Sequence, residues 1–587
     1  MARKKKTETE EKAFTPSKYQ QAIFDFIKNE EGSLVIEAVA GSGKTTTILK
    51  ALDLIPEDKQ VLFCAFNKDI VSSIKKKSKG YKNIEVRTIH GLGYIACTEN
   101  IPNLNRKVNT TKYSEEYFNN ISRYTSFHNK PLANYKQSLY RRNIFKLIDL
   151  GRLYLANSKN DIAQIAEYYS LRLLGGEIDA AYEIIEWGRK NITTIDYVDM
   201  IWYPNIFDFD LSRFSFDYIF VDEAQDISKA QREFILKCNN GKTRYFFVGD
   251  GHQSIYGFAA ADPQSFAEIK KIDGINCLPL SVCYRCPQKV IDHAKHYVPE
   301  IEAKEDAING FIDDFAKLSD IEDQDMVLCR YNSPLFATYV QLISQGKKAF
   351  ILGKDIGKNM IDVIESTGQS LLNKDLKCEG VFSMLYRDYF VRRAQIMSET
   401  KETEGVVDSM PEMIAMQDTI FALEELSANI ETTAQLIDKL SRIFSDEIAE
   451  GIVLSTIHKA KGLESNNVYI IENISSDRDK SRMTEWEEVQ ENNLKYVACT
   501  RPKVKLGFIR KGLACSLLPN RGLGGTNITQ LLNQKELLIV KLDNSKNSVR
   551  LRPTFPSNGK SLGNTPRKVN NQLTGLIGTK KPRKTLF

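Results

Sequence analysis

Short apolar runs alternate with longer helix-patterned stretches through most of the chain. The runs hold four to seven residues and are rich in β-branched and aromatic side chains. Such runs are typical of buried strands in a parallel sheet with helices between them. The sequence therefore predicts strands at 34–37, 60–66, 84–88, 216–221 and 245–249, and a second set at 325–330, 349–352, 452–455 and 468–471.

Two stretches carry helical patterning without a strand signal. Residues 95–200 are rich in Tyr, Asn, Lys and Leu at helical spacing, and residues 356–446 are polar and helix-patterned. A chain of 587 residues is also too long for a single core. We expect an α/β fold with two parallel-sheet domains, each interrupted by a helical insertion. The expected boundaries are a disordered N-terminus at 1–13, a first α/β domain at 14–94 and 201–280, its helical insertion at 95–200, a second α/β domain at 281–355 and 447–540, a short helical insertion at 356–446, and a disordered tail at 541–587.

The most informative motif follows the first predicted strand. Residues 38–45 read Ala-Val-Ala-Gly-Ser-Gly-Lys-Thr, with Ala38 where the strict phosphate-loop pattern has Gly. The two glycines let backbone N–H groups converge on a phosphate at a helix N-terminus. The lysine would reach the outer phosphates, and the Thr45 hydroxyl would hold Mg²⁺. The candidate nucleotide-binding residues are Ala40, Gly41, Ser42, Gly43, Lys44, Thr45 and Thr46.

A pair of carboxylates ends the fourth predicted strand. The run 216–221 leads into Asp222-Glu223-Ala224-Gln225-Asp226. Asp222 can coordinate Mg²⁺ through water, and Glu223 can polarise the water that attacks a γ-phosphate. An acidic turn that caps a strand would fit these residues alone. Together with the loop at 38–45, they favour a nucleotide site.

A third motif, at 248–258, narrows the class of nucleotide-binding protein that the first two motifs indicate. Residues 248–258 read Val-Gly-Asp-Gly-His-Gln-Ser-Ile-Tyr-Gly-Phe. From about residue 14 to about residue 506, the chain resembles the UvrD/Rep-like superfamily 1A helicases, in which Gly-Asp-x-x-Gln-Ser-Ile-Tyr follows Asp-Glu-x-x-Asp. The resemblance implies that Gln253 senses the γ-phosphate and that Tyr256 and Phe258 face single-stranded DNA. Bases stack on aromatic faces regardless of sequence, which suits a motor that must traverse any sequence.

Further segments follow the family's order and imply other nucleotide contacts. Gln20, in 19–23, resembles the glutamine that reads adenine. Tyr284 resembles the tyrosine that stacks on the base, and Arg285 an arginine that reaches the γ-phosphate from the second domain. Arg501, in 494–501, resembles a second arginine finger. The resemblance places Glu464 at the ribose and gives as catalytic residues Lys44, Asp222, Glu223, Gln253, Arg285 and Arg501.

Three segments resemble the family's DNA-contacting motifs, at 65–68, 88–91 and 456–464, the last carrying His-x-x-Lys-Gly-Leu-Glu. With the aromatic residues after Gln253, the implied DNA-binding residues are Phe66, Asn67, Thr88, His90, Tyr256, Phe258, Thr456 and His458. The chain departs from the family at Ala259 and Ala260, which are usually Arg and Gly. Its short insertion at 356–446 resembles that of compact phage-type and F-box-associated relatives.

The resemblance implies two RecA-like phosphate-loop domains and an ATP-dependent DNA helicase that translocates 3′→5′ on single-stranded DNA and unwinds duplex. It implies ATP and Mg²⁺ as cofactors, and single strands, single/double-strand junctions and replication or recombination proteins as partners. Three other functions are compatible with parts of the sequence. They are a single-strand translocase that displaces bound proteins with little unwinding, a nucleotide-switched binding module, and a nucleotide kinase.

Charge distribution supports a polyanionic partner. Residues 541–587 carry eleven Lys and Arg against the single acidic residue Asp543, and residues 1–12 carry a net +2. This leaves −6 for residues 13–540 within a chain total of +6. Basic ends can neutralise phosphates without sequence preference, although a solvated tail that aids solubility fits equally. No apolar run reaches membrane-spanning length and the N-terminus has no apolar signal core, so we expect a cytoplasmic protein, at a nucleoid or in a virus-infected cell, or a nuclear one in a eukaryote.

Ten cysteines lie scattered among apolar segments, which is typical of reduced thiols. Cys283 and Cys286 precede His293 and His296, a pattern that also occurs in zinc sites. The six residues between the pairs are fewer than the common zinc finger has, and Arg285 would be trapped within the chelate. We therefore expect free thiols on a packed helix and no structural zinc.

Overall fold

The computed structural model describes residues 14–65, 74, 83–128, 134–255, 264–369, 377–400, 407–408, 410–445, 450–472 and 485–510. The chain divides into two compact units, 1–514 and 515–587, and all described residues belong to the first. The predicted disordered ends lie outside the described residues, as do Phe66, Asn67, Tyr256, Phe258, Ala259 and Ala260. Every strand pair in both large sheets is parallel, so the predicted α/β class is confirmed.

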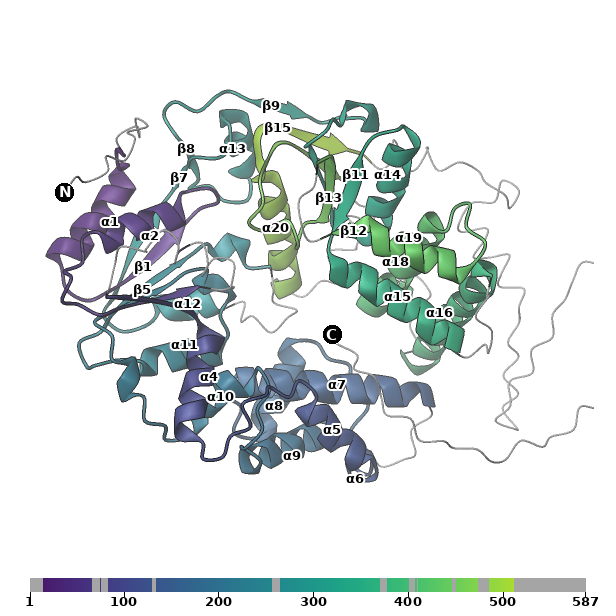
Figure 1. The fold of residues 1–587 in the computed structure, drawn as a ribbon, viewed down its shortest axis with the longest axis horizontal. Coiled ribbons are helices and arrows are strands. Elements are labelled where there is room, and N and C mark those ends of the chain that lie inside the picture. Colours follow the sequence, from purple (N-terminus) through teal and green to yellow (C-terminus); the bar gives the residue numbers. More distant parts are fainter. Residues whose placement is uncertain are drawn as a thin grey trace, which may run out of the picture. The chain divides into compact units, whose positions relative to one another are not determined.

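The first sheet has six strands in the order β3-β2-β4-β5-β1-β6. Figure 1 labels two of them, β1 and β5. Their bounds are β1 Ser33–Ala38, β2 Val61–Ala65, β3 Ile84–Thr88, β4 Tyr218–Val221, β5 Arg244–Gly249 and β6 Ile275–Leu280. Five of them occupy predicted runs. The sequence analysis missed β6, because this edge strand contains Asn276 and Pro279 and is mostly exposed. A proline is tolerated at an edge, where a backbone donor can be spared.

Helices cover both faces of the first sheet because successive strand residues point to opposite sides. Leu34 and Ile36 join one hydrophobic core with α1 (Lys18–Asn29) and α2 (Lys44–Leu52). Val35, between them, joins the other core with α4 (Ile89–Asn100), α11 (Lys229–Lys237) and α12 (Ser265–Lys270). The result is a three-layer arrangement in which the carboxyl ends of the strands share one edge.

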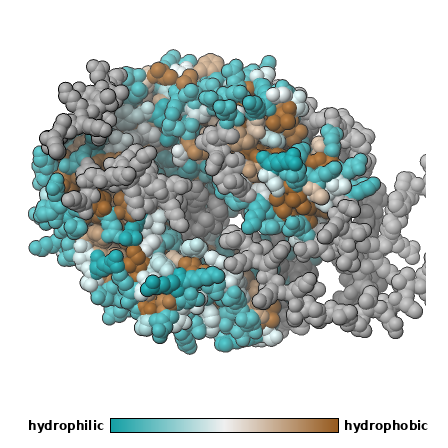
Figure 2. Space-filling model, viewed as in Figure 1, coloured by the Kyte–Doolittle hydropathy of each residue, from teal (hydrophilic) through white to brown (hydrophobic). Residues whose placement is uncertain are grey.

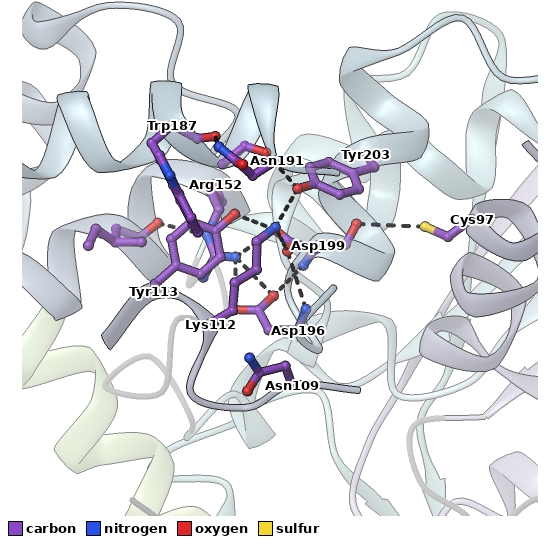
Figure 3. A network of polar contacts seen from close by, with 12 residues as sticks. Cys97, Asn109, Lys112, Tyr113, Arg152, Trp187, Asn191, Asp196, Asp199 and Tyr203 are labelled. Atoms are coloured by element: carbon purple, nitrogen blue, oxygen red, sulfur yellow. Dashed lines mark hydrogen bonds and ion pairs between the residues drawn. The ribbon is translucent and has the colours of Figure 1, made fainter. Parts of the chain in front are cut away.

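A helical layer lies between β3 and β4 in the chain and has its own core. Its helices are α5 Lys112–Asn119, α6 Ile121–Thr125, α7 Asn134–Leu153, α8 Lys159–Tyr168, α9 Glu177–Lys190 and α10 Asp199–Ile206. Within it, Figure 3 shows a buried polar network centred on Asp199. Lys112 Nζ lies 2.7 Å from Asp199 Oδ2, and Arg152 Nη1 lies 2.8 Å from Asp199 Oδ1. The three side chains are at most 2% exposed and link α5, α7 and α10.

The second large sheet has seven strands in the order β12-β11-β13-β10-β14-β15-β9. Their bounds are β9 Phe311–Asp313, β10 Met326–Cys329, β11 Ala349–Leu352, β12 Phe444–Ser445, β13 Ile452–Thr456, β14 Ser465–Ile471 and β15 Pro502–Ile509. Val327 packs on one face with α14 (Asn332–Ser344), whereas Leu328 packs on the other with α20 (Glu485–Cys499).

Three strands of this sheet were missed. The short edge strands β9 and β12 offer too few residues for a pattern, and β15 begins Pro-Lys-Val-Lys, in which Lys503 and Val504 are exposed. The expectation that 356–446 contains no strand is wrong at β12, which pairs with Ile351 and Leu352 of β11. Neighbouring strands supply the hydrogen bonds that this short segment could not form alone.

Helices also occupy the chain between β11 and β12: α15 Lys354–Gln369, α16 Cys378–Thr400, α18 Pro411–Leu426 and α19 Thr433–Ile443. A short two-stranded parallel pair, β7 (Val282–Cys283) with β8 (Glu302–Ala303), and α13 (Gln288–Ala294) follow the first sheet in the chain. The assignment of these segments to domains at the boundaries given above stays a prediction.

On the face shown in Figure 2, hydrophilic side chains separate smaller hydrophobic areas. Among the described residues, no helix is both long and apolar enough to cross a membrane.

We predict that Asp199→Asn destabilises the helical layer. The substitution leaves Lys112 buried without its carboxylate partner and removes one of the carboxylates that pair with Arg152, and breaking a buried ion pair costs about 3–5 kcal/mol. Urea unfolding followed by tryptophan fluorescence should show a lower midpoint, because Trp187 and Trp202, two of the three tryptophans, lie in this layer. Asp208→Asn, at an exposed position just after α10, should shift stability by no more than about 0.5 kcal/mol. Equal midpoints for the two variants would contradict the prediction.

Candidate functional site

A left-handed glycine turn connects β1 to α2. β1 ends at Ala38, α2 begins at Lys44, and Gly41 and Gly43 have φ angles of 67° and 78°. Gly41 also has no room for a side chain, since a Cβ there would lie 2.8 Å from Arg285 Cβ. This is the strand–turn–helix geometry that the motif at 38–45 predicts, with backbone N–H groups gathered at a helix start.

The turn has features that fit a phosphate group. The Ser42 side chain is 1% exposed, and its hydroxyl has no hydrogen-bond partner among the described residues. A buried polar group without a partner is unfavourable, and a bound phosphate oxygen would satisfy it. Thr45 and Thr46 lie in the first turn of α2, next to Lys44.

Two carboxylates face the turn from the end of β4. Lys44 Nζ lies 3.3 Å from both carboxylate oxygens of Glu223, and the Asp222 side chain accepts a hydrogen bond from the Glu223 backbone N–H at 2.9 Å. Glu223 has a φ of 52°, an unusual conformation for a residue with a side chain. Such strain persists where the surroundings hold it, which is common at functional sites.

Burial raises the pKa of both carboxylates, whereas the nearby lysine charges lower it. Burial and the neighbouring Glu223 charge raise the pKa of Asp222. Burial also opposes ionisation of Glu223, but the charges of Lys44 and Lys461 lower its pKa. A divalent cation next to Asp222 would favour its charged form. The oxygen donors of Asp222 and Thr45 are of the type that Mg²⁺ prefers, so they fit this metal.

Gln253 lies beside this site, at the end of β5. It is 6% exposed, and its amide nitrogen donates to Asp250 Oδ2 at 2.6 Å. Asp250 is 2% exposed, and burial raises its pKa. The amide oxygen of Gln253 accepts a hydrogen bond from Arg501 Nη2 at 3.3 Å. Arg501 lies between α20 and β15 of the second sheet, so Gln253 connects the strand ends of two sheets.

Arg501 is 1% exposed and is held by Val497 O at 2.8 Å from its Nε. Burial and the charge of Arg285 lower its pKa to about 10, so the guanidinium stays protonated at neutral pH. The Arg285 Nε donates to Glu464 Oε2 at 2.8 Å, and its Nη1 donates to Thr500 O at 3.2 Å. Arg285, one predicted arginine finger, therefore contacts the backbone of the residue that precedes Arg501, the other. Glu464 also pairs with Lys503.

Direct contacts join the glycine turn to residues that follow the first sheet in the chain. The Tyr284 N–H donates to Gly41 O at 2.8 Å, and the Ala40 N–H donates to the Tyr496 hydroxyl at 2.9 Å. Tyr496 lies on α20. The turn thus contacts both segments that carry the predicted arginine fingers.

The predicted adenine residues also meet. Gln20 is 2% exposed, and its amide nitrogen donates to Thr47 Oγ1 at 2.9 Å. The Tyr284 hydroxyl donates to Gln20 Oε1 at 3.3 Å, and the Tyr284 side chain is 41% exposed. The pair lies beside Gly43, whose missing Cβ would be 3.8 Å from the Tyr284 ring and 3.9 Å from the Gln20 amide. An open aromatic face next to the phosphate turn can accept a purine by stacking.

The described DNA candidates lie at strand ends. Thr88 ends β3 and caps α4, with its hydroxyl accepting from the Gly91 N–H at 3.1 Å, and His90 lies in the first turn of α4. Thr456 ends β13, and its hydroxyl accepts from the Lys459 N–H at 3.4 Å. Burial lowers the pKa of His90, and burial with the charge of Arg330 lowers that of His458 to about 3, so both imidazoles are neutral at pH 7.

Several residues of this site were missed by the sequence analysis. Lys461 Nζ lies 2.5 Å from Asp226 Oδ2 and 2.7 Å from Gln253 O, with both charged side chains at most 9% exposed. The motifs at 222–226, 248–258, 456–464 and 494–501 contain these residues: Asp226, Asp250, Lys461 and Tyr496. Their positions in those motifs were the available signal, but motif membership alone does not tell which side chains form pairs.

The expectation that Cys283 and Cys286 lie on a packed helix is wrong. Cys283 lies on β7 and Cys286 precedes α13, so neither is on a helix. A helix could not include the bend at 284–286, which brings the Cys286 N–H to 3.4 Å from Cys283 Sγ. The described residues contain no group of three or more His, Cys, Asp or Glu arranged to hold a metal ion. His293 packs on Phe508 and Tyr297.

Comparison with known proteins extends these observations. The profile described as the UvrD/REP helicase N-terminal domain matches residues 19–272. F-box DNA helicase protein 1 of Schizosaccharomyces pombe is 24% identical over 83% of this chain and 56% of its own length. F-box DNA helicase 1 of Gallus gallus is 23% identical over 82% of this chain and 48% of its own length. ATP-dependent DNA helicase Rep of Buchnera aphidicola subsp. Schizaphis graminum is 21% identical over 77% of this chain and 63% of its own length. The chain thus spans about half to two thirds of these relatives.

We predict that Lys461→Met destabilises the protein. It leaves Asp226 buried without its cation, and removing one partner of a buried pair costs about 3–5 kcal/mol. Lys459→Met is a matched control two residues away, because Lys459 pairs with Asp355 where both side chains are about half exposed. Thermal unfolding should show a clear loss for the first variant and a change of at most about 1 kcal/mol for the second. Similar losses of stability in the two variants would show that the buried Lys461–Asp226 pair contributes no more than the exposed Lys459–Asp355 pair.

Proposed function

Because this chain is a UvrD-like superfamily 1 protein, as the sequence predicts, we propose that it is an ATP-dependent DNA helicase that translocates 3′→5′ on single-stranded DNA and unwinds duplex. The observation that carries the proposal is the convergence of Arg501 and Lys461 on Gln253, next to the glycine turn. Cations from one sheet reach the phosphate site of another, which is the arrangement that phosphoryl transfer between two lobes needs.

In this proposal, the residues of the first sheet bind the nucleotide and activate the attacking water. Backbone N–H groups of the turn and Lys44 would hold the phosphates of ATP, and Thr45 and Asp222 would hold Mg²⁺. Bound Mg²⁺ neutralises charge on the transferred phosphoryl group. Glu223, kept ionised by its lysine neighbours, orients the attacking water and accepts its proton.

The residues that follow the first sheet sense the γ-phosphate. Arg285 and Arg501 stabilise the charge that develops during transfer, and Gln253 reports whether the γ-phosphate is present. Gln20 and Tyr284 hold the adenine, and Glu464 contacts the ribose. Glu464 already pairs with Arg285, so nucleotide binding would redistribute this ion pair.

The same contacts can couple hydrolysis to movement. Thr88 and His90 follow β3, and Thr456 and His458 follow β13, so each sheet presents polar side chains at a strand end. We propose that a single strand of DNA contacts the residues after β3 and those after β13. A change in the contacts of Gln253 would then change the distance between these two DNA-contacting segments. Single strands and single/double-strand junctions are the proposed DNA partners.

A second function is favoured by one observation. The described helices of the insertion between β11 and β12 pack partly into the core of their own sheet, with Leu436 and Leu440 buried against it. A compact insertion suits a translocase that displaces bound proteins with little unwinding. Parallel assays on bare duplex and on a protein-coated single strand distinguish the two.

We predict DNA-stimulated ATP hydrolysis that depends on the turn and its carboxylate. Lys44→Ala and Glu223→Gln should each reduce turnover by about 10²-fold or more, because each removes a group that acts on the transferred phosphoryl group or its nucleophile. Lys50→Ala is the matched control, since Lys50 lies on the same helix, is about half exposed and forms an ion pair with Asp53. Undiminished turnover in the first two variants would exclude the proposed site, and a protein inert with and without DNA would favour a nucleotide-switched module.

We predict that unwinding needs a 3′ single-stranded tail. Duplexes with a 3′ tail, a 5′ tail or blunt ends are compared with ATP present, and strand separation is followed by gel or fluorescence. Separation of the 3′-tailed substrate alone supports the proposed polarity. Preference for the 5′ tail would reverse it, and protein displacement without strand separation would favour the translocase.

A further inference from the structure

The thiol pair at Cys283 and Cys286 lies against the glycine turn. A Cβ on Gly41 would lie 2.9 Å from Cys283 Sγ, and Val39 and Ala40 belong to the same hydrophobic cluster as both cysteines. The two residues between the thiols are Tyr284 and Arg285, which the proposed function places at the adenine and the γ-phosphate.

The pair has the local geometry of a bridgeable dithiol. The chain bends through 284–286, and the Cys286 N–H donates to Cys283 Sγ at 3.4 Å. A disulfide requires Cα atoms about 4.4–6.8 Å apart, a separation that a bent chain with two intervening residues can reach. The Cys286 thiol in turn donates to Thr500 O at 3.4 Å, an oxygen that also accepts from Arg285.

The surroundings favour the thiolate form of Cys283, whose side chain is fully buried. The neighbouring Cys286 thiol lowers the pKa of Cys283 to about 7 against the effect of burial, and the N–H groups of Arg285 and Cys286 and the Arg285 charge act in the same direction. A thiolate is the nucleophile in thiol oxidation. In contrast, burial raises the pKa of Cys64 and of Cys499.

We propose that Cys283 and Cys286 are a redox modification site, at which a peroxide oxidises the two thiols to a disulfide that switches off the nucleotide site. The Cys283 thiolate attacks one peroxide oxygen, the O–O bond breaks, and a sulfenic acid forms with release of water after protonation. The Cys286 sulfur then attacks the sulfenic sulfur, the S–O bond breaks, and a second water leaves. The two thiols lose two electrons in total, hydrogen peroxide gains them, and the thiol protons end in water.

The consequence for activity rests on the proposed function, whereas the chemistry does not. The disulfide encloses Tyr284 and Arg285 in a small ring and fixes their backbone. It also removes the hydrogen bond from Cys286 to Thr500, the residue before Arg501. Both guanidiniums that face the γ-phosphate thus lose their reduced-state positions. A dithiol reductant restores them by thiol–disulfide exchange.

The test treats the reduced full-length protein with hydrogen peroxide, blocks remaining thiols and maps tryptic peptides. Trypsin cuts after Arg285, so the disulfide appears as peptide 272–285 linked to peptide 286–289. The linked pair should form in the wild type and disappear with dithiothreitol. Because peptide 272–285 also contains the exposed Cys277, the Cys277→Ser variant is the matched control and should still give the linked pair.

Activity is measured on the same samples. Peroxide should reduce DNA-stimulated ATP turnover at least about tenfold, in line with the loss of a guanidinium from phosphoryl transfer, and dithiothreitol should restore it. Cys283→Ser should give no linked pair and should keep its turnover after peroxide. If that variant does not fold, peptide mapping of the wild type and of Cys277→Ser still decides whether the disulfide forms.

The remaining outcomes are distinct. Absence of the linked pair, or linkage of peptide 272–285 to peptide 496–503 through Cys499, would overturn the proposal. Formation of the pair without loss of turnover would overturn its regulatory role. A reduced protein without DNA-stimulated turnover would instead count against the proposed function, while the linked peptides would still report on the thiols.

Discussion

The structure depends on the pairing of buried charges at the carboxyl ends of the first sheet. Asp222, Glu223, Asp226 and Asp250 are concentrated there, and burial raises the pKa of three of them. Lys44 is the nearby cation that the same sheet supplies. Lys461 and Arg501, from the chain of the second sheet, supply the others by direct contact with Asp226 and Gln253. Unpaired buried charges are costly, so this excess of carboxylates favours contact with a partner that brings cations.

The same constraint links stability to chemistry. Lys461 stabilises the carboxylate cluster, and Arg501 contacts Gln253, whose amide nitrogen donates to Asp250. The proposed function also uses the guanidinium of Arg501 on a phosphate. A nucleotide would bring its own negative charge and metal, and would change which cations the carboxylates need. The close approach of Gly41 to Cys283 and Arg285 means that a shift on either side is transmitted to the other. The thiol pair is placed where a small covalent change would disturb this balance.

The helical layer between β3 and β4 also contains buried charges, and it pairs them within itself. Lys112, Arg152, Asp196 and Asp199 form a buried network with its own charge balance, and a cluster of Tyr, Trp and aliphatic side chains surrounds it (Figure 3). Because β3 and β4 do not neighbour each other in the sheet order, inserting helices between them in the chain leaves the hydrogen-bonded ladder intact. The sheet can therefore keep its strand ends in register while the insertion varies.

The sequence by itself determined the class of fold, most central strands and the motifs of the UvrD/Rep-like resemblance, which the family profile and the relatives confirm. Central strands such as β1 and β5 were predictable because burial on both faces demands a continuous apolar run. The edge strands β6, β9 and β12 were not, because neighbours that are distant in the chain supply the hydrogen bonds that their composition does not demand. Likewise, the motifs contained Lys461, Asp226 and Tyr496 without naming their partners. Only the tertiary structure decided that Lys461 meets Asp226 and that Tyr496 meets Ala40, because pairs 235 and 456 residues apart are chosen by how the sheets pack and not by local pattern.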